Sequence, residues 1–342
     1  MKVRARAPLR LGLAGGGTDL ELYSDEFGGA VLNATIARYA HASLTLTDEP
    51  DVVFLATDMD VKETFSTSLK VEQARLKLHL GVYRRITEQF LGGKAPGVVL
   101  ETMIDAPPGS GLGSSSALVV AMVEAFRVAY DLPLGPYDVA QLAYDIERSD
   151  LGLAGGKQDQ YAAAFGGVNF IEFLPNNRVL VNPLRLSSGV DNEMQSSIVV
   201  CFTGASRASH DIIIDQVGHV ANHDPSALEG MHQLKRDAVD MKAALLRGDF
   251  DDVAVILNRS WIAKKATARS VSNPQIDALW TVAMENGAKG GKISGAGGGG
   301  FIMFLTDPAH RSRLMRALKS AGGEPDTVTF SSKGVEGWIA RS

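Results

Sequence analysis

The chain has 342 residues, of which 45% are hydrophobic and 21% charged, a composition that suits two globular domains and excludes disordered and fibrous classes. The net charge of -5 is small and no long run of lysine or arginine occurs, so neither a nucleic-acid partner nor a membrane partner is expected. Because Cys201 is the only cysteine and Pro8 and Arg10 interrupt the first apolar stretch, we expect a cytoplasmic protein whose single thiol is buried in a strand.

From residue 2 to about residue 103 the sequence predicts mainly strands. Residues 2–7 alternate apolar and charged side chains, and 42–47 and 52–56 are short β-type runs. One helix is expected to interrupt them, because apolar residues recur at helical spacing over 76–90, just before two glycines.

Helices dominate beyond residue 105, with strands between them. Apolar spacing predicts helices over 114–130, 137–149, 207–217, 226–247, 250–266 and 274–286. Short β-type runs predict strands over 168–173, 178–181, 197–202, 291–294, 301–305 and 327–330. Because the two types occur in runs, we predict an α+β fold with mixed sheets rather than a doubly wound one. A loop-like stretch over 183–190 divides the chain into predicted domains of residues 1–187 and 188–342.

The segment 107–117, PPGSGLGSSSA, is the strongest local signal. It follows an expected strand and opens an apolar helix, so its glycines let the backbone approach a polyanion while the first helix amides point at it. A phosphate-binding loop is the natural use, although no Gly-Lys-Ser/Thr ends it as in the common P-loop. The alternative is a serine-capped helix after a flexible turn.

Two further glycine loops flank this segment. The first, LAGGGTD at 13–19, follows the strand that bears Arg10, and its alternative is a plain tight turn. The third, SGAGGGG at 294–300, has dinucleotide-fingerprint spacing, but the β-like run 301–305 follows it where that fingerprint requires a helix. We therefore expect its glycines to allow close backbone approach to a ligand or to the first loop.

In this order and separation, the three loops resemble the signature motifs of the GHMP kinase superfamily over residues 7–304. The second loop matches its pattern closely, and the first resembles the galactokinase motif with Gly-Glu-His replaced by three glycines, which argues against galactose. With its three glycines, the first loop is similar to that of the heptose 7-phosphate kinases and fucose kinases. The segments 273–277 and 287–292 are similar to the same branch. The length of the chain is similar to that of the bacterial heptose enzymes, since fucose kinases are usually much longer.

The resemblance implies a two-domain fold with the active site between the domains and a reaction that uses ATP and Mg²⁺. The implied reaction is phosphorylation of the C1 hydroxyl of D-glycero-D-manno-heptose 7-phosphate, giving the 1,7-bisphosphate for nucleotide-heptose and surface polysaccharide. It implies Mg²⁺ contacts at Ser115 and Glu147, for which the alternatives are a helix cap and an exposed helix carboxylate. The residues expected to hold the ATP phosphates are Pro108, Gly109, Ser110, Gly111, Leu112, Gly113, Ser114, Ser115 and Ser116.

Asp159 matches the catalytic aspartate of the superfamily and Arg10 the cation beside it. The aspartate would accept the proton of the acceptor hydroxyl, and the arginine would stabilise the aspartate and the transferred phosphoryl charge. Their alternatives are a turn or cap aspartate and a surface arginine. The residues expected at the acceptor are Gly16, Gly17, Thr18, Asp19, Lys157, Gly297 and Gly298. Lys157 is a weaker candidate among these, and further weaker candidates are Arg207, Ser209, Lys264 and Lys265; each of the five is more often simply solvated.

Other functions remain open at the level of sequence. They are a kinase of another sugar of the fucose, mannose or galactose type, a non-catalytic sugar sensor on the same fold, and a diphosphate decarboxylase. A sugar-phosphate acceptor requires fixed cations or helix amides away from the reacting hydroxyl. We expect at least one of the basic candidates to point into the cleft. The partner is a small-molecule sugar phosphate, and a homodimer is left open.

Overall fold

The structure, a computed structural model, describes residues 1–49, 51–66, 74–204 and 209–341. Its larger sheet has eight strands, and all neighbouring pairs are antiparallel except β3 and β5. The main path runs β12 (Glu336–Ile339), β1 (Lys2–Ala14), β2 (Gly29–Thr47), β5 (Gly97–Ile104), β3 (Val52–Ala56) and β4 (Val61–Phe65). The start of β2 also pairs with β6 (Val168–Leu174), which pairs with β7 (Arg178–Pro183).

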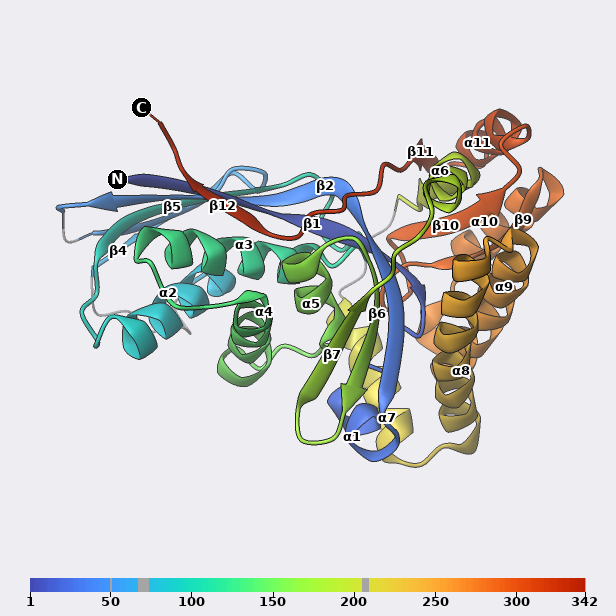
Figure 1. Cartoon of the computed structure of the whole chain (residues 1–342), viewed down its shortest axis with the longest axis horizontal. Coiled ribbons are helices and arrows are strands. Elements are labelled where there is room, and N and C mark those ends of the chain that lie inside the picture. The colour runs from blue at the N-terminus through green and yellow to red at the C-terminus, as the bar shows by residue number, and fades with distance from the viewer. Residues whose placement is uncertain (50, 67–73, 205–208, 342) are drawn as a thin grey trace.

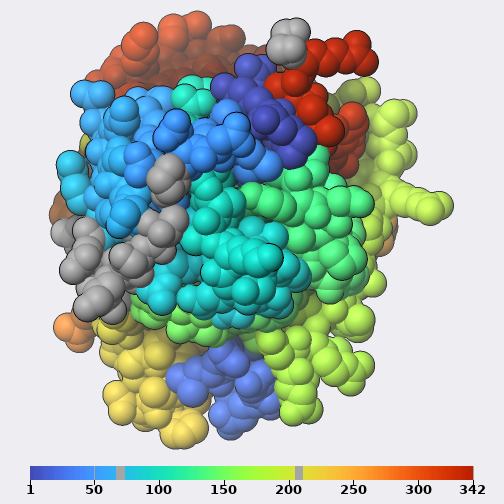
Figure 2. All heavy atoms as spheres, turned by 90° about the vertical axis from the view of Figure 1, so that its left-hand side faces the viewer, coloured from blue at the N-terminus to red at the C-terminus, as the bar shows by residue number. Residues whose placement is uncertain are grey.

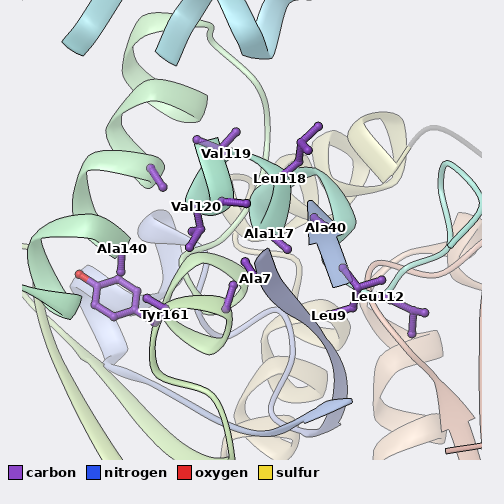
Figure 3. Close-up of a cluster of buried hydrophobic side chains, with 14 of the residues drawn as sticks. Ala7, Leu9, Ala40, Leu112, Ala117, Leu118, Val119, Val120, Ala140 and Tyr161 are labelled. Carbon is purple, nitrogen blue, oxygen red and sulfur yellow. The ribbon is translucent and has the colours of Figure 1, made fainter. Parts of the chain in front are cut away.

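Four helices lie on one side of this sheet, below it in Figure 1: α2 (Lys77–Phe90), α3 (Ser114–Ala129), α4 (Pro136–Asp145) and α5 (Gln158–Phe165). The central one is α3, which packs on β1, β2 and β12 and is buried without a break over residues 116–126. Most of these residues are apolar, as expected for a helix that other elements surround, and Ser116 and Glu124 are the polar exceptions. Figure 3 shows its Val120 together with Ala7 of β1 and Tyr161 of α5 in the same core cluster.

A second, four-stranded antiparallel sheet lies at the other end of the molecule, at the right of Figure 1. Its order is β11 (Glu324–Thr327), β8 (Ile198–Phe202), β10 (Phe301–Thr306) and β9 (Ala288–Ile293). The helix α9 (Phe250–Thr267) packs on β9 and forms a hairpin with α8 (Pro225–Arg247). The remaining helices are α1 (Glu21–Phe27), α6 (Ser188–Ser197), α7 (Ser209–Ala221), α10 (Pro274–Glu285) and α11 (Arg311–Ser320).

After β11 the chain returns to the first sheet. The strand β12 pairs antiparallel with β1, with Val3 opposite Ile339 and Arg6 opposite Glu336. Figure 2 shows the red C-terminal segment beside the dark blue N-terminal strand. The division into residues 1–187 and 188–342 stays a prediction, and the C-terminal strand contributes to the sheet that β1 begins.

The predicted α+β class is confirmed, and most expected long helices begin and end close to the predicted residues. The sequence did not predict α1, α5, α6, α11 or β12. The last expected strand, 327–330, is wrong in position because β11 ends at Thr327. The expected helix 137–149 changes at Ile146 into a π-helical turn, Ile146–Asp150. Cys201 is buried and free in β8, as predicted.

Candidate active site

A cleft of about 360 Å³ brings residues of the three glycine loops together. The first loop contributes Gly17 and Asp19, and Leu20 follows it directly. The second loop contributes Gly109, Gly111, Gly113, Ser114, Ser115 and Ser116, and the third Gly295 and Ala296. Other residues complete the lining: Arg10, Glu147, Arg148, Leu153, Ala154, Gly155, Gly156, Gln158, Asp159, Ile213, Gln216 and Lys264.

The second loop turns repeatedly before it becomes a helix. Gly109, Gly111 and Gly113 have φ of 69°, 73° and 73°, a region that other residues rarely adopt. Gly113 is the residue before α3, and the amides of the first turn of a helix have no intrahelical partners. Because Ser114, Ser115 and Ser116 line the cleft, this end of α3 can bind a phosphate group.

The third loop packs backbone to backbone against the second. A Cβ added to Gly295 would lie 2.7 Å from the carbonyl oxygen of Gly111, and one added to Gly300 would lie 2.4 Å from that of Ser110. The amide of Phe301 donates to Ser110 O at 3.0 Å. The expected close approach is therefore made to the second loop rather than to the first.

Arg10 and Asp159 form a partly buried ion pair in the cleft. The guanidinium donates from Nε to Oδ1 of Asp159 at 2.7 Å, Nη2 lies 2.6 Å from the same oxygen, and Nη1 donates to Gly111 O at 2.6 Å. Arg10 is 3% exposed. Asp159 lies in the first turn of α5, and its Cγ is 3.1 Å from where a Cβ on Gly113 would be. The carboxylate is thus held beside the end of the second loop.

Asp19 connects the first loop to the start of α5. Its carboxylate is 2% exposed and accepts hydrogen bonds from the amide of Gly17 at 3.0 Å, the amide of Gln158 at 3.1 Å and Nε2 of Gln158 at 3.2 Å. A Cβ on Gly156 would collide with it. Three acceptor sites of the carboxylate are therefore used within the protein, and Gln158, which sequence reasoning missed, fixes it next to Asp159.

Two buried lysines lie behind the first loop. Lys264 of α9 donates to Gly16 O at 3.1 Å, and Lys292 of β9 donates to Gly12 O at 2.7 Å. Each is 4% exposed. Burial lowers the pKa of Lys264 to about 8 and that of Lys292 to about 7, because a desolvated ammonium is disfavoured. Lys292 had no distinct signal in the sequence beyond its place before the third loop.

The π-helical turn brings Glu147 and Arg148 into the cleft. Glu147 is 1% exposed, accepts a hydrogen bond from Nε2 of Gln160 at 2.5 Å and lies 3.9 Å from Nη1 of Arg148. Burial raises the pKa of Glu147. It is therefore not the exposed helix carboxylate that the alternative reading assumed. Glu147 and the hydroxyl of Ser115 are oxygen ligands of the kind that Mg²⁺ prefers, and both line the cleft.

Several expected residues are not part of the lining. Lys157 is buried, with its ammonium 5.3 Å from the centre of the Tyr144 ring. The Thr18 hydroxyl bonds to the carbonyls of Gly15 and Ala30. Gly16, Gly297, Gly298, Pro108, Ser110 and Leu112 also lie outside the lining. Lys265 is exposed beside the Trp261 ring. Arg207 lies outside the described residues, as does the side chain of Ser209, the residue that begins α7. The roles predicted for all these residues stay predictions.

Known proteins resemble the chain over nearly its whole length. Residues 77–167 match the GHMP kinases N terminal domain and residues 241–324 the GHMP kinases C terminal family. The chain is 44% identical to the D-glycero-alpha-D-manno-heptose 7-phosphate kinase of Campylobacter jejuni, over 98% of each chain.

Solved structures agree with this match. A crystal structure of a D-glycero-D-manno-heptose 1-phosphate kinase from Bacteroides thetaiotaomicron is 40% identical, covers 99% of this chain and 100% of its own, and superposes with a TM-score of 0.84. Lactococcus lactis galactokinase bound to galactose, at 18% identity with 98% of this chain and 95% of its own covered, shares the fold with a TM-score of 0.76. In the part of the chain that the structure describes, no helix is both long and apolar enough to span a membrane.

Proposed function

The chain belongs to the GHMP kinase family and is an ATP-dependent sugar kinase, and we propose that it phosphorylates the C1 hydroxyl of D-glycero-D-manno-heptose 7-phosphate. The product would be the 1,7-bisphosphate, for nucleotide-heptose and surface polysaccharide synthesis. Support comes from the two heptose kinases above, which are 44% and 40% identical to this chain. One is named a heptose 7-phosphate kinase and the other a heptose 1-phosphate kinase. The observation that carries the proposal is the Arg10–Asp159 pair beside the end of the second loop.

In the proposed reaction the acceptor oxygen forms a bond to the γ-phosphorus of ATP while the bond from that phosphorus to ADP breaks. Asp159 takes the proton of the hydroxyl, so the oxygen need not carry a full charge. Arg10 holds the carboxylate of Asp159 in place through two nitrogens and adds positive charge next to the transferred group. Asp19 and Gln158 keep the start of α5, and hence Asp159, fixed against the first loop.

The first turn of α3 would hold the nucleotide phosphates through its amides. Ser115 and Glu147 would hold Mg²⁺, which would neutralise phosphate charge when bound. The buried position of Glu147 supports this role, because a desolvated carboxylate beside a cleft favours the approach of a cation.

The proposal is tested by measuring ADP release with a panel of acceptors: D-glycero-D-manno-heptose 7-phosphate, the same heptose without phosphate, mannose, fucose and galactose. We expect the heptose phosphate to have the highest kcat/KM, and ³¹P NMR to detect an anomeric phosphate in its product. Asp159→Asn should lower kcat by roughly 100-fold or more while nucleotide binding persists, because the proton acceptor is lost and the size is kept. A free sugar as the best substrate, or near-normal kcat in Asp159→Asn, would contradict the proposal.

A further inference from the structure

A kinase whose acceptor already carries a phosphate can bind that phosphate through a cationic side chain that does not take part in the transfer reaction. Of the residues that the structure describes, three with cationic side chains line the cleft: Arg10, Arg148 and Lys264. The question is which of them is free to bind an anion on the acceptor. The argument for one of them rests on the proposed function, because it assumes a sugar phosphate as the acceptor.

Both arginines already have partners. Arg10 is committed to Asp159 and to the carbonyl of Gly111. Arg148 donates from Nη1 to Leu153 O at 3.3 Å and from Nη2 to Gly156 O at 3.4 Å, and Nη1 lies 3.9 Å from Glu147. Its Nε has no partner among the described residues, but this atom is buried away from solvent and so is not open to a ligand in the cleft. Its guanidinium also occupies the space that a side chain at Gly155 would need. Arg148 therefore holds the loop 153–156 in place.

Lys264 has spare donors. Its ammonium carries three N–H groups, and its one hydrogen bond within the described part of the chain goes to Gly16 O at 3.1 Å. In the same part of the chain, no carboxylate lies within ion-pair distance of it, although Asp19 is close enough to favour its charged form. A buried charge without a partner is unfavourable. An anion that enters the cleft would supply that partner.

The first loop lies against this ammonium. A Cβ added to Gly17 would lie 3.5 Å from Nζ of Lys264, and Gly17 has a φ of 112° that favours glycine. Asp159 lies against Gly113 of the second loop, whereas Lys264 lies against Gly16 and Gly17 of the first. The two groups thus line the cleft from different walls, so an acceptor can offer its hydroxyl to one and its phosphate to the other.

We propose that the Lys264 ammonium binds the phosphate that the acceptor already carries, and that this contact makes the enzyme prefer phosphorylated over free sugars. A contact between an ammonium and a phosphate is a charge-assisted hydrogen bond. A free sugar has no group to replace it, so it leaves the buried ammonium unpaired and is disfavoured.

The neighbouring lysine provides a matched control. Lys265 follows Lys264 directly but is exposed, with its ammonium 5.3 Å from the centre of the Trp261 ring. Lys264→Met and Lys265→Met therefore remove the same charge from adjacent positions, one in the cleft and one outside it. Lys264→Arg keeps the charge at this position. The melting temperatures of Lys264→Arg and Lys264→Met show whether each variant folds.

The experiment measures kcat/KM for D-glycero-D-manno-heptose 7-phosphate and for the same heptose without phosphate. The wild type should prefer the phosphorylated acceptor by about 100-fold, as one strong charge-assisted contact implies. In Lys264→Met this ratio should fall to within about threefold, mainly through a higher KM for the phosphorylated acceptor, while turnover of the free heptose persists. Lys265→Met should keep the wild-type ratio, and Lys264→Arg should keep most of it. Calorimetric titration of each acceptor without nucleotide should show the same order of affinities.

Other results would overturn the proposal in distinguishable ways. Equal efficiency of the wild type with both acceptors would contradict the proposed function itself. A wild-type preference that survives in Lys264→Met would contradict only the role of Lys264. An equal fall in kcat with both acceptors would mean that Lys264 contacts the transferred phosphoryl group instead. Should Lys264→Met fail to fold, a Lys264→Arg variant that loses the preference while it keeps its stability would contradict the proposal.

Discussion

Glu147 combines deep burial with a charge that the proposed function needs. Burial raises its pKa above the ordinary value, so the folded protein binds this proton more tightly than the unfolded chain does. The stabilising contribution of the protonated form is fully present below the unfolded-state pKa, and it is lost as pH rises through the higher folded-state pKa. When no cation is bound, the buried Glu147 therefore makes the protein less stable at neutral pH than at acidic pH.

We expect Glu147→Gln to raise the melting temperature of the metal-free protein at pH 7 by about 2 °C or more, because the variant buries a neutral group of the same shape. The difference from wild type should shrink as pH falls. Activity should require a higher Mg²⁺ concentration, because the proposed ligand is weakened and mass action offsets the loss. The exposed Glu88→Gln is the control and should change neither property. A lower melting temperature for Glu147→Gln at pH 7 would contradict the argument.

At the scale of elements, the contact between the second and third glycine loops joins the two sheets. The third loop connects β9 to β10 in the smaller sheet, and the second leads from β5 of the larger sheet into α3. Gly300 approaches Ser110 so closely that no side chain fits between them, and its φ is 81°. A change at Gly300 therefore acts directly on the loop that leads into α3, whose first turn is the proposed phosphate site.

A substitution at Gly322 serves as a control, because it introduces backbone strain without affecting the contact between the two loops. Its φ is 88°, but no atom lies within 4 Å of an added Cβ. Gly322→Ala should cost about 1 kcal/mol, the usual penalty for a left-handed residue. Gly300→Ala should cost at least ~2 kcal/mol more, because it adds a backbone collision, and it should raise the KM for ATP, which Gly322→Ala should leave unchanged. Denaturant titration and kinetics measure both effects, and equal behaviour of the two variants would show that the loop contact contributes nothing.

At the scale of the whole molecule, the C-terminal strand closes the edge of the larger sheet. β12 pairs with β1 over four residue pairs, and α3 packs against both strands. Arg6 and Glu336 add a partly exposed ion pair at 2.7 Å across the same two strands. Without β12, the edge of the strand that carries Arg10 would expose unpaired backbone groups.

A chain that ends at residue 334 should consequently be less stable by a few kcal/mol, because each lost backbone hydrogen bond costs roughly 1 kcal/mol, and it should aggregate more readily. A chain that ends at residue 340 keeps β12 and should behave like the full-length protein. Thermal unfolding followed by light scattering compares them. If the shorter chain keeps the full melting temperature, β12 does not protect this edge.

Sequence alone determined the fold class, the long helices and the three glycine loops, because these depend on local periodicity and on residues with special backbone freedom. It also singled out Arg10 and Asp159, which the structure brings into contact across 149 positions of the chain. Short elements such as α5 and β12 were missed because their stability comes from packing on distant strands and not from their own pattern.

Only the tertiary structure decided which of several similar side chains enter the cleft. Lys157, Lys264 and Lys265 are alike in sequence, yet Lys264 alone of these three lines the cleft, while Lys157 lies against Tyr144 and Lys265 beside Trp261. The sequence likewise did not predict which residues contact the third glycine loop or that Glu147 is buried. The direction of a side chain and its exposure to water depend on the elements that fold around it, and those elements lie far away along the chain.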